Sequence, residues 1–130
     1  MELLIDTQSF IWFMEDDIKM PIKIKEIMND DDDDNVLLLS IVSLWEITIK
    51  TSIGKLKMQR SIDDVIKNIS EYGFKILPIK SNHLLILSKL EFIHRDPFDR
   101  MIIAQGISEN ISVISSDNVF KEYPIQVIYS

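Results

Sequence analysis

The residues of this sequence best suited to chemistry are four acids that lie far apart along the chain: Asp6, Glu46, Asp99 and Asp117. Asp6 ends the apolar run 3–5 and Asp117 ends the run 111–116, so each follows a candidate strand. Glu46 and Asp99 each fall near the apparent start of a helix. Carboxylates gathered in one pocket repel one another unless a cation, usually a divalent metal, occupies the gap between them. The four acids therefore predict a metal-dependent enzyme, provided that the fold brings them together.

The elements that must position these acids follow from the hydropathy pattern and the capping residues. Short apolar runs predict five strands, over residues 2–6, 36–39, 74–79, 111–116 and 125–129. The segments between them predict helices over 7–14, 21–28 and 62–71, from Ser40 or Ser43 to Ser52, from a cap at Ser81 or Asn82 to Leu90, and from Asp96-Pro97 to Ser108. Short strands that alternate with helices predict parallel βαβ units with helices on both faces.

The expected fold class is α/β, as a three-layer α/β/α domain with a small parallel sheet of strand order 3-2-1-4-5, and residues 1–130 form one domain. In that order the first and fourth strands are neighbours, and ligands bind beyond their carboxyl ends. Asp6 and Asp117 follow these two strands, and the helices of Glu46 and Asp99 begin at the same edge. Topology alone therefore predicts that the four acids converge.

Each acid also has a purely structural explanation. Asp6 and Asp117 suit helix N-caps or turns, and Glu46 completes a capping box with Ser43. Asp96 suits an N-cap, and Asp99 at the third helical position favours the helix dipole. These explanations must account for four residues separately, whereas a metal site accounts for their shared location once.

Composition narrows the classes of function. The net charge of −7 argues against a passive nucleic-acid coat, although an acidic nuclease pocket remains compatible with it. The absence of Cys excludes disulfides, thiolate zinc sites and Cys nucleophiles, and fits a reducing compartment. No apolar stretch approaches a membrane span and the N-terminus is not a signal peptide, so we expect a cytoplasmic protein without membrane contact. With three Gly, there is neither a P-loop nor a dinucleotide fingerprint.

Four segments carry a family likeness: Leu3-Leu4-Ile5-Asp6-Thr7, Ser43-Leu44-Trp45-Glu46-Ile47-Thr48-Ile49-Lys50, Arg95-Asp96-Pro97-Phe98-Asp99-Arg100-Met101-Ile102-Ile103-Ala104-Gln105 and Ile114-Ser115-Ser116-Asp117. Together, and in this order, they resemble the PIN-domain ribonucleases, specifically the VapC-like toxins of bacterial toxin–antitoxin pairs. The likeness covers nearly the whole chain, and the second and third segments are the specific ones. The chain departs from the family at Ser116, where a basic residue is frequent, and at Gly106, where Ala is usual.

The resemblance implies an acidic site on Asp6, Glu46, Asp99 and Asp117, one or two magnesium or manganese ions, and hydrolysis of RNA phosphodiester bonds by a metal-activated water. Asp6 and Asp99 are the expected direct ligands. Glu46 is expected to ligate directly or through water, and Asp117 to support a second metal or orient water. The residues expected around this set are Thr7, Ser115 and Asp96 as hydrogen-bonding support, and Arg95, Arg100 and Lys50 as contacts to the RNA backbone or as ordinary solvated surface.

The resemblance also implies a small antitoxin partner, and the acidic pocket favours a partner with a basic amphipathic tail. Ile11, Trp12 and Trp45 are the candidate residues for docking the tail. The alternative for both Trp residues is a place in the core. We expect the toxin to form a homodimer.

Two alternatives to an enzyme remain open from the residues: a phospho-receiver-like signalling domain, and a non-catalytic interaction module with an acidic rim. A phospho-receiver would need an Asp after the third strand, where this chain has Pro78-Ile79-Lys80. A haloacid-type phosphatase would need a second Asp two positions after Asp6. The run Asp30 to Asp34 lacks the spacing of a calcium loop and predicts a solvated loop. His83 is expected on a helix surface and His94 in a loop, neither with a catalytic partner.

Overall fold

The computed structural model describes residues 1–29 and 34–128 of the chain. Its sheet holds five parallel strands in the order β3-β2-β1-β4-β5. The strands are β1 (Glu2–Ile5), β2 (Val36–Ser40), β3 (Phe74–Leu77), β4 (Ser112–Ile114) and β5 (Val127–Ile128). The helices are α1 (Thr7–Met14), α2 (Ile22–Met28), α3 (Ile41–Ser52), α4 (Ile62–Lys67), α5 (Ser81–Lys89), α6 (Pro97–Glu109) and the 3₁₀ helix η1 (Asn118–Glu122).

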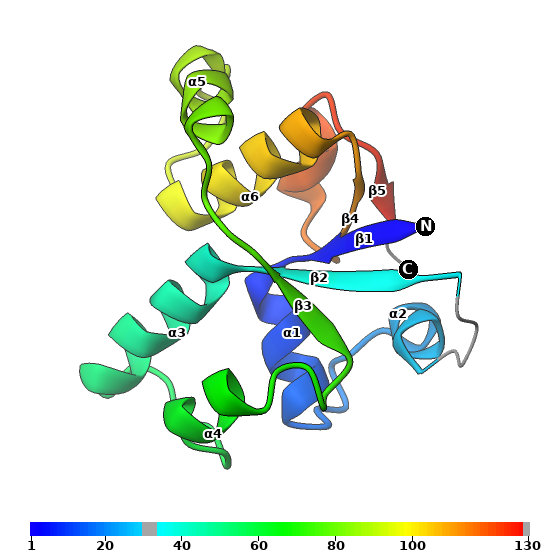
Figure 1. Cartoon of the computed structure of the whole chain (residues 1–130), viewed down its shortest axis with the longest axis vertical. Coiled ribbons are helices and arrows are strands. Elements are labelled where there is room, and N and C mark those ends of the chain that lie inside the picture. The colour runs from blue at the N-terminus through cyan, green and yellow to red at the C-terminus, as the bar shows by residue number, and fades with distance from the viewer. Residues whose placement is uncertain (30–33, 129–130) are drawn as a thin grey trace.

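The helices form a layer on each face of the sheet. Figure 1 shows α5 and α6 on one side, and α1, α2, α3 and α4 on the other. Alternation along β1 supplies both cores: Leu3 and Ile5 pack with the α1–α4 side, and Leu4 packs with the α6 side. All three side chains are buried, as expected for a central parallel strand covered on both faces. The predicted three-layer architecture and strand order are confirmed.

Several predicted boundaries were wrong. The helix expected over 62–71 ends at Lys67, and residues 68–73 form turns before β3. The helix expected after Ser81 or Asn82 begins at Ser81 itself, with Lys80 as its N-cap and the His83 ring accepting the Lys80 N–H. The sequence also gave no indication of η1, because a five-residue 3₁₀ helix is too short for a periodic pattern. The acidic run at 30–33 lies outside the described residues. Within the described part of the chain, no helix is long and apolar enough to cross a bilayer.

The packing of α6 on β4 depends on a glycine. A Cβ added to Gly106 would lie 2.9 Å from Cγ2 of Val113, which is closer than real Cβ contacts. Val113 is fully buried in β4 and has a stiff, branched side chain, so it has little room to move away. Gly106 therefore lets α6 approach the sheet closely, and α6 is the helix that carries Asp99.

We expect Gly106→Ala to lower the free energy of unfolding by about 1 kcal/mol. Overpacking typically costs about 1–3 kcal/mol, and the better helix propensity of Ala returns about 1 kcal/mol of that. Urea unfolding of the variant and the wild type measures the difference. A variant at least as stable as the wild type would show that the helix shifts freely on β4.

Candidate active site

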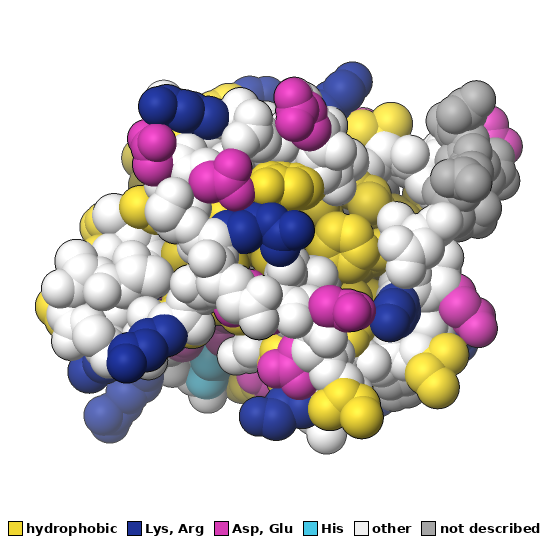
Figure 2. Space-filling view, turned by 90° about the horizontal axis from the view of Figure 1, so that it is seen from below, with side chains coloured by type: hydrophobic (Ala, Val, Ile, Leu, Met, Phe, Trp, Pro, Cys, Tyr) yellow, Lys and Arg dark blue, Asp and Glu magenta, His cyan; other side chains and the backbone are white. Residues whose placement is uncertain are grey.

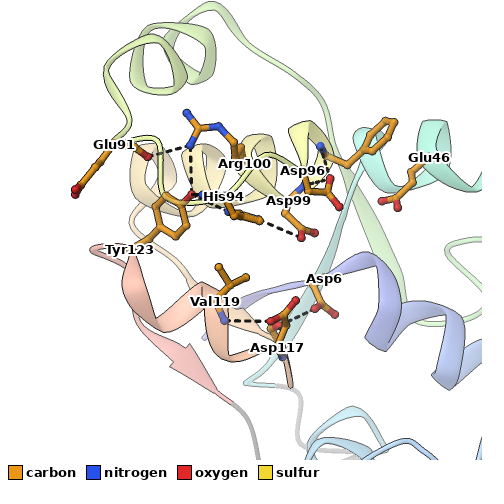
Figure 3. A network of polar contacts seen from close by, with 12 residues as sticks. Asp6, Glu46, Glu91, His94, Asp96, Asp99, Arg100, Asp117, Val119 and Tyr123 are labelled. Carbon is orange, nitrogen blue, oxygen red and sulfur yellow. Dashed lines mark hydrogen bonds and ion pairs between the residues drawn. The ribbon is translucent and has the colours of Figure 1, made fainter.

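A cavity of about 330 Å³ opens at the carboxyl edge of the sheet, beside β1 and β4. Its lining includes all four predicted acids, which come from four separate segments of the chain: Asp6, Glu46, Asp99 and Asp117. Figure 3 shows the carboxylates of Asp6, Asp99 and Asp117 facing a common space, with Glu46 beside them on α3. The predicted convergence of the four acids is therefore observed.

Asp6 stands directly after β1 and is 4% exposed. Its Oδ1 accepts a hydrogen bond from the Ser9 N–H at 2.8 Å, so Asp6 is the N-cap of α1. Its Oδ2 accepts a hydrogen bond from the Ser115 hydroxyl at 2.6 Å. Burial raises the pKa of Asp6 in spite of these bonds, with a smaller contribution from the charge of Asp117. Asp6 therefore caps α1 and lines the cavity at the same time.

Glu46 does not belong to a capping box. Helix α3 begins at Ile41, and the Ser40 hydroxyl caps it by accepting the Val42 N–H at 3.0 Å. Ser43 lies inside the helix and shares a hydrogen bond with Thr7 at 2.9 Å. Glu46 is 5% exposed, and its Oε1 is buried without a hydrogen-bond partner. A buried carboxylate oxygen without a partner is costly, so this atom is a strong candidate to face a ligand.

Two acids near the start of α6 differ in their contacts. Asp96 is the N-cap, and its Oδ1 accepts the N–H groups of Phe98 and Asp99. Both acids line the cavity, and burial is the largest cause that raises the pKa of Asp99 to about 8. The other causes are the negative charges of its neighbours: Asp96, Asp6, Glu46 and Asp117. The four acids therefore interact electrostatically as well as sharing a cavity.

Asp117 follows β4 and caps η1 by accepting the Val119 N–H at 3.1 Å. Its own N–H donates to the Ser115 hydroxyl at 3.0 Å, and that hydroxyl donates to Asp6. Ser115 therefore ties together the loop of Asp117 and the carboxylate of Asp6, as expected for a supporting residue. Thr7 supports the site differently from the prediction, because its hydroxyl contacts Ser43 rather than a carboxylate.

Lys50 brings a positive charge to the cavity. Its ammonium lies 2.6 Å from Glu46 Oε2, one helical turn along α3. This hydrogen bond raises the pKa of Lys50, and the charges of Asp96 and Asp99 add to the shift. Lys50 remains partly exposed, so it can also reach a phosphate at the cavity mouth.

The donor chemistry of the cavity fits a hard divalent cation. Its acids offer carboxylate oxygens alone, which suit Mg²⁺ and Mn²⁺, and Glu46 Oε1 has no other partner. Among residues 1–29 and 34–128, however, no set of three or more His, Asp or Glu side chains is placed so that it could hold a metal ion. The side chains as they stand face one cavity without forming a finished coordination sphere.

The predicted phosphate-contacting residues divide into two groups. Arg95 is exposed, and Lys50 lines the cavity. Arg100 is 8% exposed, and its guanidinium donates to the carbonyls of Glu91 and Leu90. Its placement does not fit the predicted contact with RNA, because these bonds use the guanidinium to fix the loop before α6.

The placement of His83 and the contacts of His94 differ from the prediction. His83 is fully buried rather than on a helix surface, and its Nε2 lies 2.8 Å from Glu109. His94 lies in a loop as expected, yet its Nε2 is 3.3 Å from Asp99 Oδ2. Sequence reasoning missed this second contact, although the five-residue spacing between His94 and Asp99 could have suggested that the loop folds back onto α6.

The apolar candidates for partner binding are partly accessible. Ile11 and Trp12 line the cavity, and Trp12 also lines a second hollow of about 80 Å³ along α1. Figure 2 shows exposed hydrophobic side chains in a hollow on the side of the molecule where α1, α2 and α4 lie. Trp45 is 58% exposed and packs edge-on against Phe98, with ring centroids 5.3 Å apart. Trp45 is therefore not a core residue, whereas Trp12 is half-buried against the core.

We expect Asp99→Asn to stabilise the metal-free protein increasingly as the pH rises from about 4 to 8. The raised folded-state pKa means that the unfolded chain loses this proton first, so wild-type stability falls across that window. Asn cannot ionise and escapes the loss. One pKa unit corresponds to about 1.4 kcal/mol, and we expect at least that difference at pH 8.

Urea unfolding in the presence of a chelator, at pH 5 and pH 8, measures this difference. Asp63→Asn is the matched control, because Asp63 is an exposed carboxylate on α4 whose contact is an ion pair with Lys67. Equal stability of Asp99→Asn and the wild type at pH 8 would contradict the electrostatic account of the cavity.

Comparisons with known proteins agree with this geometry. The chain is similar to the crystal structure of VapBC2 from Rickettsia felis bound to a DNA fragment from its promoter, with a TM-score of 0.76, 16% identity, and 99% of this chain and 98% of that chain covered. For DNA-bound VapBC from Salmonella typhimurium the TM-score is 0.75 and the identity 17%, with 99% of this chain and 98% of that chain covered. For VapBC-1 from nontypeable Haemophilus influenzae the TM-score is 0.71 and the identity 18%, with 99% of this chain and 98% of that chain covered.

At such identities the likeness to these structures shows a common fold. No curated protein matches the sequence closely. The family model "PIN domain" matches residues 3–126, which is nearly the whole chain. With the strand order and the four converging acids, this match establishes that the chain belongs to the PIN-domain family.

Proposed function

We propose that this protein is a Mg²⁺-dependent endoribonuclease and the toxin of a cytoplasmic toxin–antitoxin pair. The observation that carries the proposal is the convergence of Asp6, Glu46, Asp99 and Asp117 on one cavity. Burial and mutual repulsion make this arrangement unfavourable for the empty fold. Such a cluster is expected where a cation binds, and membership of the PIN-domain family gives the cation a nuclease role.

In this proposal the four acids would hold the metal, with Asp6 and Asp99 as direct ligands and Mn²⁺ as an alternative to Mg²⁺. When bound, the metal would supply Lewis-acid stabilisation of the phosphate charge and lower the pKa of the attacking water. Ser115 holds Asp6 Oδ2, which keeps that carboxylate turned toward the cavity. The contact between Asp6 and the Ser9 N–H fixes its other oxygen at the start of α1.

RNA would enter from the exposed side of the cavity. Lys50 is the best-placed cation for a substrate phosphate, because it lines the cavity and lies one turn from Glu46. Arg95 is exposed just before the N-cap of α6 and would contact the backbone further out. Phosphate contacts of this kind position the strand without reading its sequence.

The proposed partner is an antitoxin with a basic amphipathic tail. An Arg from the tail would pair with the acidic cavity, since its planar fork matches carboxylates. Apolar residues of the tail would then pack on Ile11, Trp12 and Trp45. The similar structures are VapBC complexes, and they support a two-component assembly for this chain as well. We further propose that the toxin forms a homodimer.

A non-catalytic interaction module is the second candidate. The observation in its favour is that Lys50 lies 2.6 Å from Glu46 Oε2, so a side chain of the protein already offsets part of the acidic charge. An acidic rim of this kind could bind a basic partner without any reaction. The two candidates differ in whether the purified protein cleaves RNA when metal is supplied.

We expect Asp99→Asn to lower the rate of RNA cleavage about a hundredfold or more while the fold remains intact, which is the usual effect of removing one stabilising group from an active site. The measurement is cleavage of single-stranded RNA by the purified protein at millimolar Mg²⁺. Added Mg²⁺ or Mn²⁺ should also raise the melting temperature of the wild type, because the ion binds the native state alone. Asp6→Asn should respond much less to the ion.

The control replaces Asp31 to Asp34 with Ser, which removes four negative charges from a run without the spacing of metal ligands. Its activity should stay within a few-fold of the wild type, because a run without ligands contributes only long-range charge, which salt screens over about 10 Å at 0.1 M. Wild-type protein that cleaves no RNA with either metal would favour the interaction module.

We expect Trp12→Ala to leave the protein folded and active but to weaken binding of the antitoxin tail. Removing a central indole from an interface typically costs about 2 kcal/mol or more, which corresponds to roughly thirtyfold in affinity. Melting temperature, RNA cleavage and partner affinity are measured on the same variant.

Trp45→Ala is the comparison, because Trp45 is more exposed and packs mainly on Phe98. If Trp12→Ala melts early and loses activity and partner binding together, Trp12 belongs to the core. If the folded variant binds the tail at wild-type affinity, the docking site lies elsewhere.

A further inference from the structure

A chain of polar contacts connects the interior of the protein to Asp99. It links Arg100 on α6, Tyr123 after η1, and His94 in the loop before α6. His94 is 19% exposed, Tyr123 is 3% exposed and Arg100 is 8% exposed, so the chain is largely shielded from water. Figure 3 shows it ending on Asp99 at the cavity.

The donors around the Tyr123 hydroxyl determine its direction. Arg100 Nη1 donates to this oxygen at 3.2 Å, and the His94 backbone N–H donates to it at 3.2 Å. A phenolic oxygen accepts about two hydrogen bonds and donates one. Both accepting positions are therefore in use, and the remaining hydroxyl proton points to His94 Nδ1 at 2.7 Å.

This direction fixes the state of the imidazole. Because His94 Nδ1 accepts the Tyr123 proton, it cannot carry a proton of its own. The ring proton must then lie on Nε2, which faces Asp99 Oδ2 at 3.3 Å. The opposite arrangement, with Nδ1 protonated, would aim three donors at the Tyr123 oxygen.

We propose that His94 is a positioning residue, which donates from Nε2 to Asp99 Oδ2 and thereby leaves the other carboxylate oxygen free for the cavity. Tyr123 and Arg100 hold the ring in the required tautomer. The inference rests on the proposed function, because it concerns how one proposed metal ligand is held. A proton on the opposite oxygen of Asp99 would leave the donated bond intact.

The loop that carries His94 is built to hold this position. The Arg100 guanidinium donates to the carbonyls of Glu91 and Leu90, and it lies 4.7 Å from the centre of the Phe92 ring. Arg100 is the neighbour of Asp99 on α6. The same helix therefore fixes both ends of the contact, the imidazole through the loop and the carboxylate directly. Orientation of a ligand by a neighbouring hydrogen bond typically changes metal affinity about 10–100-fold.

The first test is the tautomer, measured by long-range ¹H–¹⁵N correlation spectra of the imidazole rings in metal-free protein. The chain has two histidines, so the spectrum is simple to assign with His94→Gln. His83 is the internal control, because its Nδ1 accepts the Lys80 N–H and does not contact Tyr123. We expect His94 to carry its proton on Nε2, and we expect Tyr123→Phe to shift His94 toward a tautomer mixture while His83 stays unchanged.

The second test is Mn²⁺ affinity, measured by calorimetry. His94→Gln retains a donor near the place of Nε2, whereas His94→Asn offers one only near Nδ1 and His94→Ala offers none. We expect Ala and Asn to weaken Mn²⁺ binding about tenfold or more, and Gln to restore much of it. If His94 had only a structural role, the loss of Mn²⁺ affinity in each variant would follow its loss of melting temperature. His94→Gln would then bind Mn²⁺ no more tightly than an equally stable His94→Asn.

Two results would overturn the proposal: a wild-type spectrum with the His94 proton on Nδ1, or equal Mn²⁺ affinity in the wild type, His94→Gln and His94→Ala. If His94→Ala does not fold, Tyr123→Phe decides, because it removes one hydroxyl and leaves the Arg100 bond to Glu91 in place. A wild type that binds no Mn²⁺ would sink the proposed function, and the tautomer spectrum would then decide on the His94 contact by itself.

Discussion

The interaction on which this site depends is repulsion between carboxylates in a partly buried cavity. Asp6 and Glu46 are almost fully buried, and Asp99 lies close enough for both to raise its pKa. Ionised carboxylates in such a place need a compensating positive charge. Lys50 supplies part of it at Glu46 Oε2, whereas Glu46 Oε1 is left buried without a partner. The fold thus holds a local excess of negative charge that a divalent cation would relieve.

The structure tolerates this charge because several acids also serve the backbone. Asp6 caps α1, Asp96 caps α6 and Asp117 caps η1, so each lies at the positive end of a helix. Asp6 shows that a cap can also line the cavity, since its Oδ1 accepts from the start of α1 while the side chain lines the cavity with Asp99 and Asp117. Capping is therefore compatible with the ligand role proposed for Asp6.

The strand order and the convergence of the acids could be predicted from the sequence, because strands that alternate with helices allow few topologies. In these topologies the carboxyl ends of the parallel strands lie at one edge of the sheet, and the acids follow those ends. The sequence was insufficient where a contact joins distant loops. His94 and Tyr123 are 29 positions apart and meet only through the packing of α6 and η1. The capping box predicted from Ser43 to Glu46 was wrong because the same sequence pattern can also occur inside a helix. In the structure Ser40 is the N-cap, and Ser43 lies within α3.

Asp96 and Asp99 have different electrostatic environments although they lie within a single helical turn. Asp96 Oδ1 accepts two backbone N–H groups, so its charge is stabilised by the start of α6. The Asp99 carboxylate meets His94 and a cavity lined by other acids, so burial and repulsion disfavour its charge. Neutralising Asp99 should therefore strengthen the metal-free fold. Asp6 shows that capping does not prevent this effect, because Asp6 caps α1 and burial still raises its pKa. What distinguishes this cavity from a set of helix ends is that its acids are buried together, so that the charges of Asp6, Glu46 and Asp117 add to the raised pKa of Asp99.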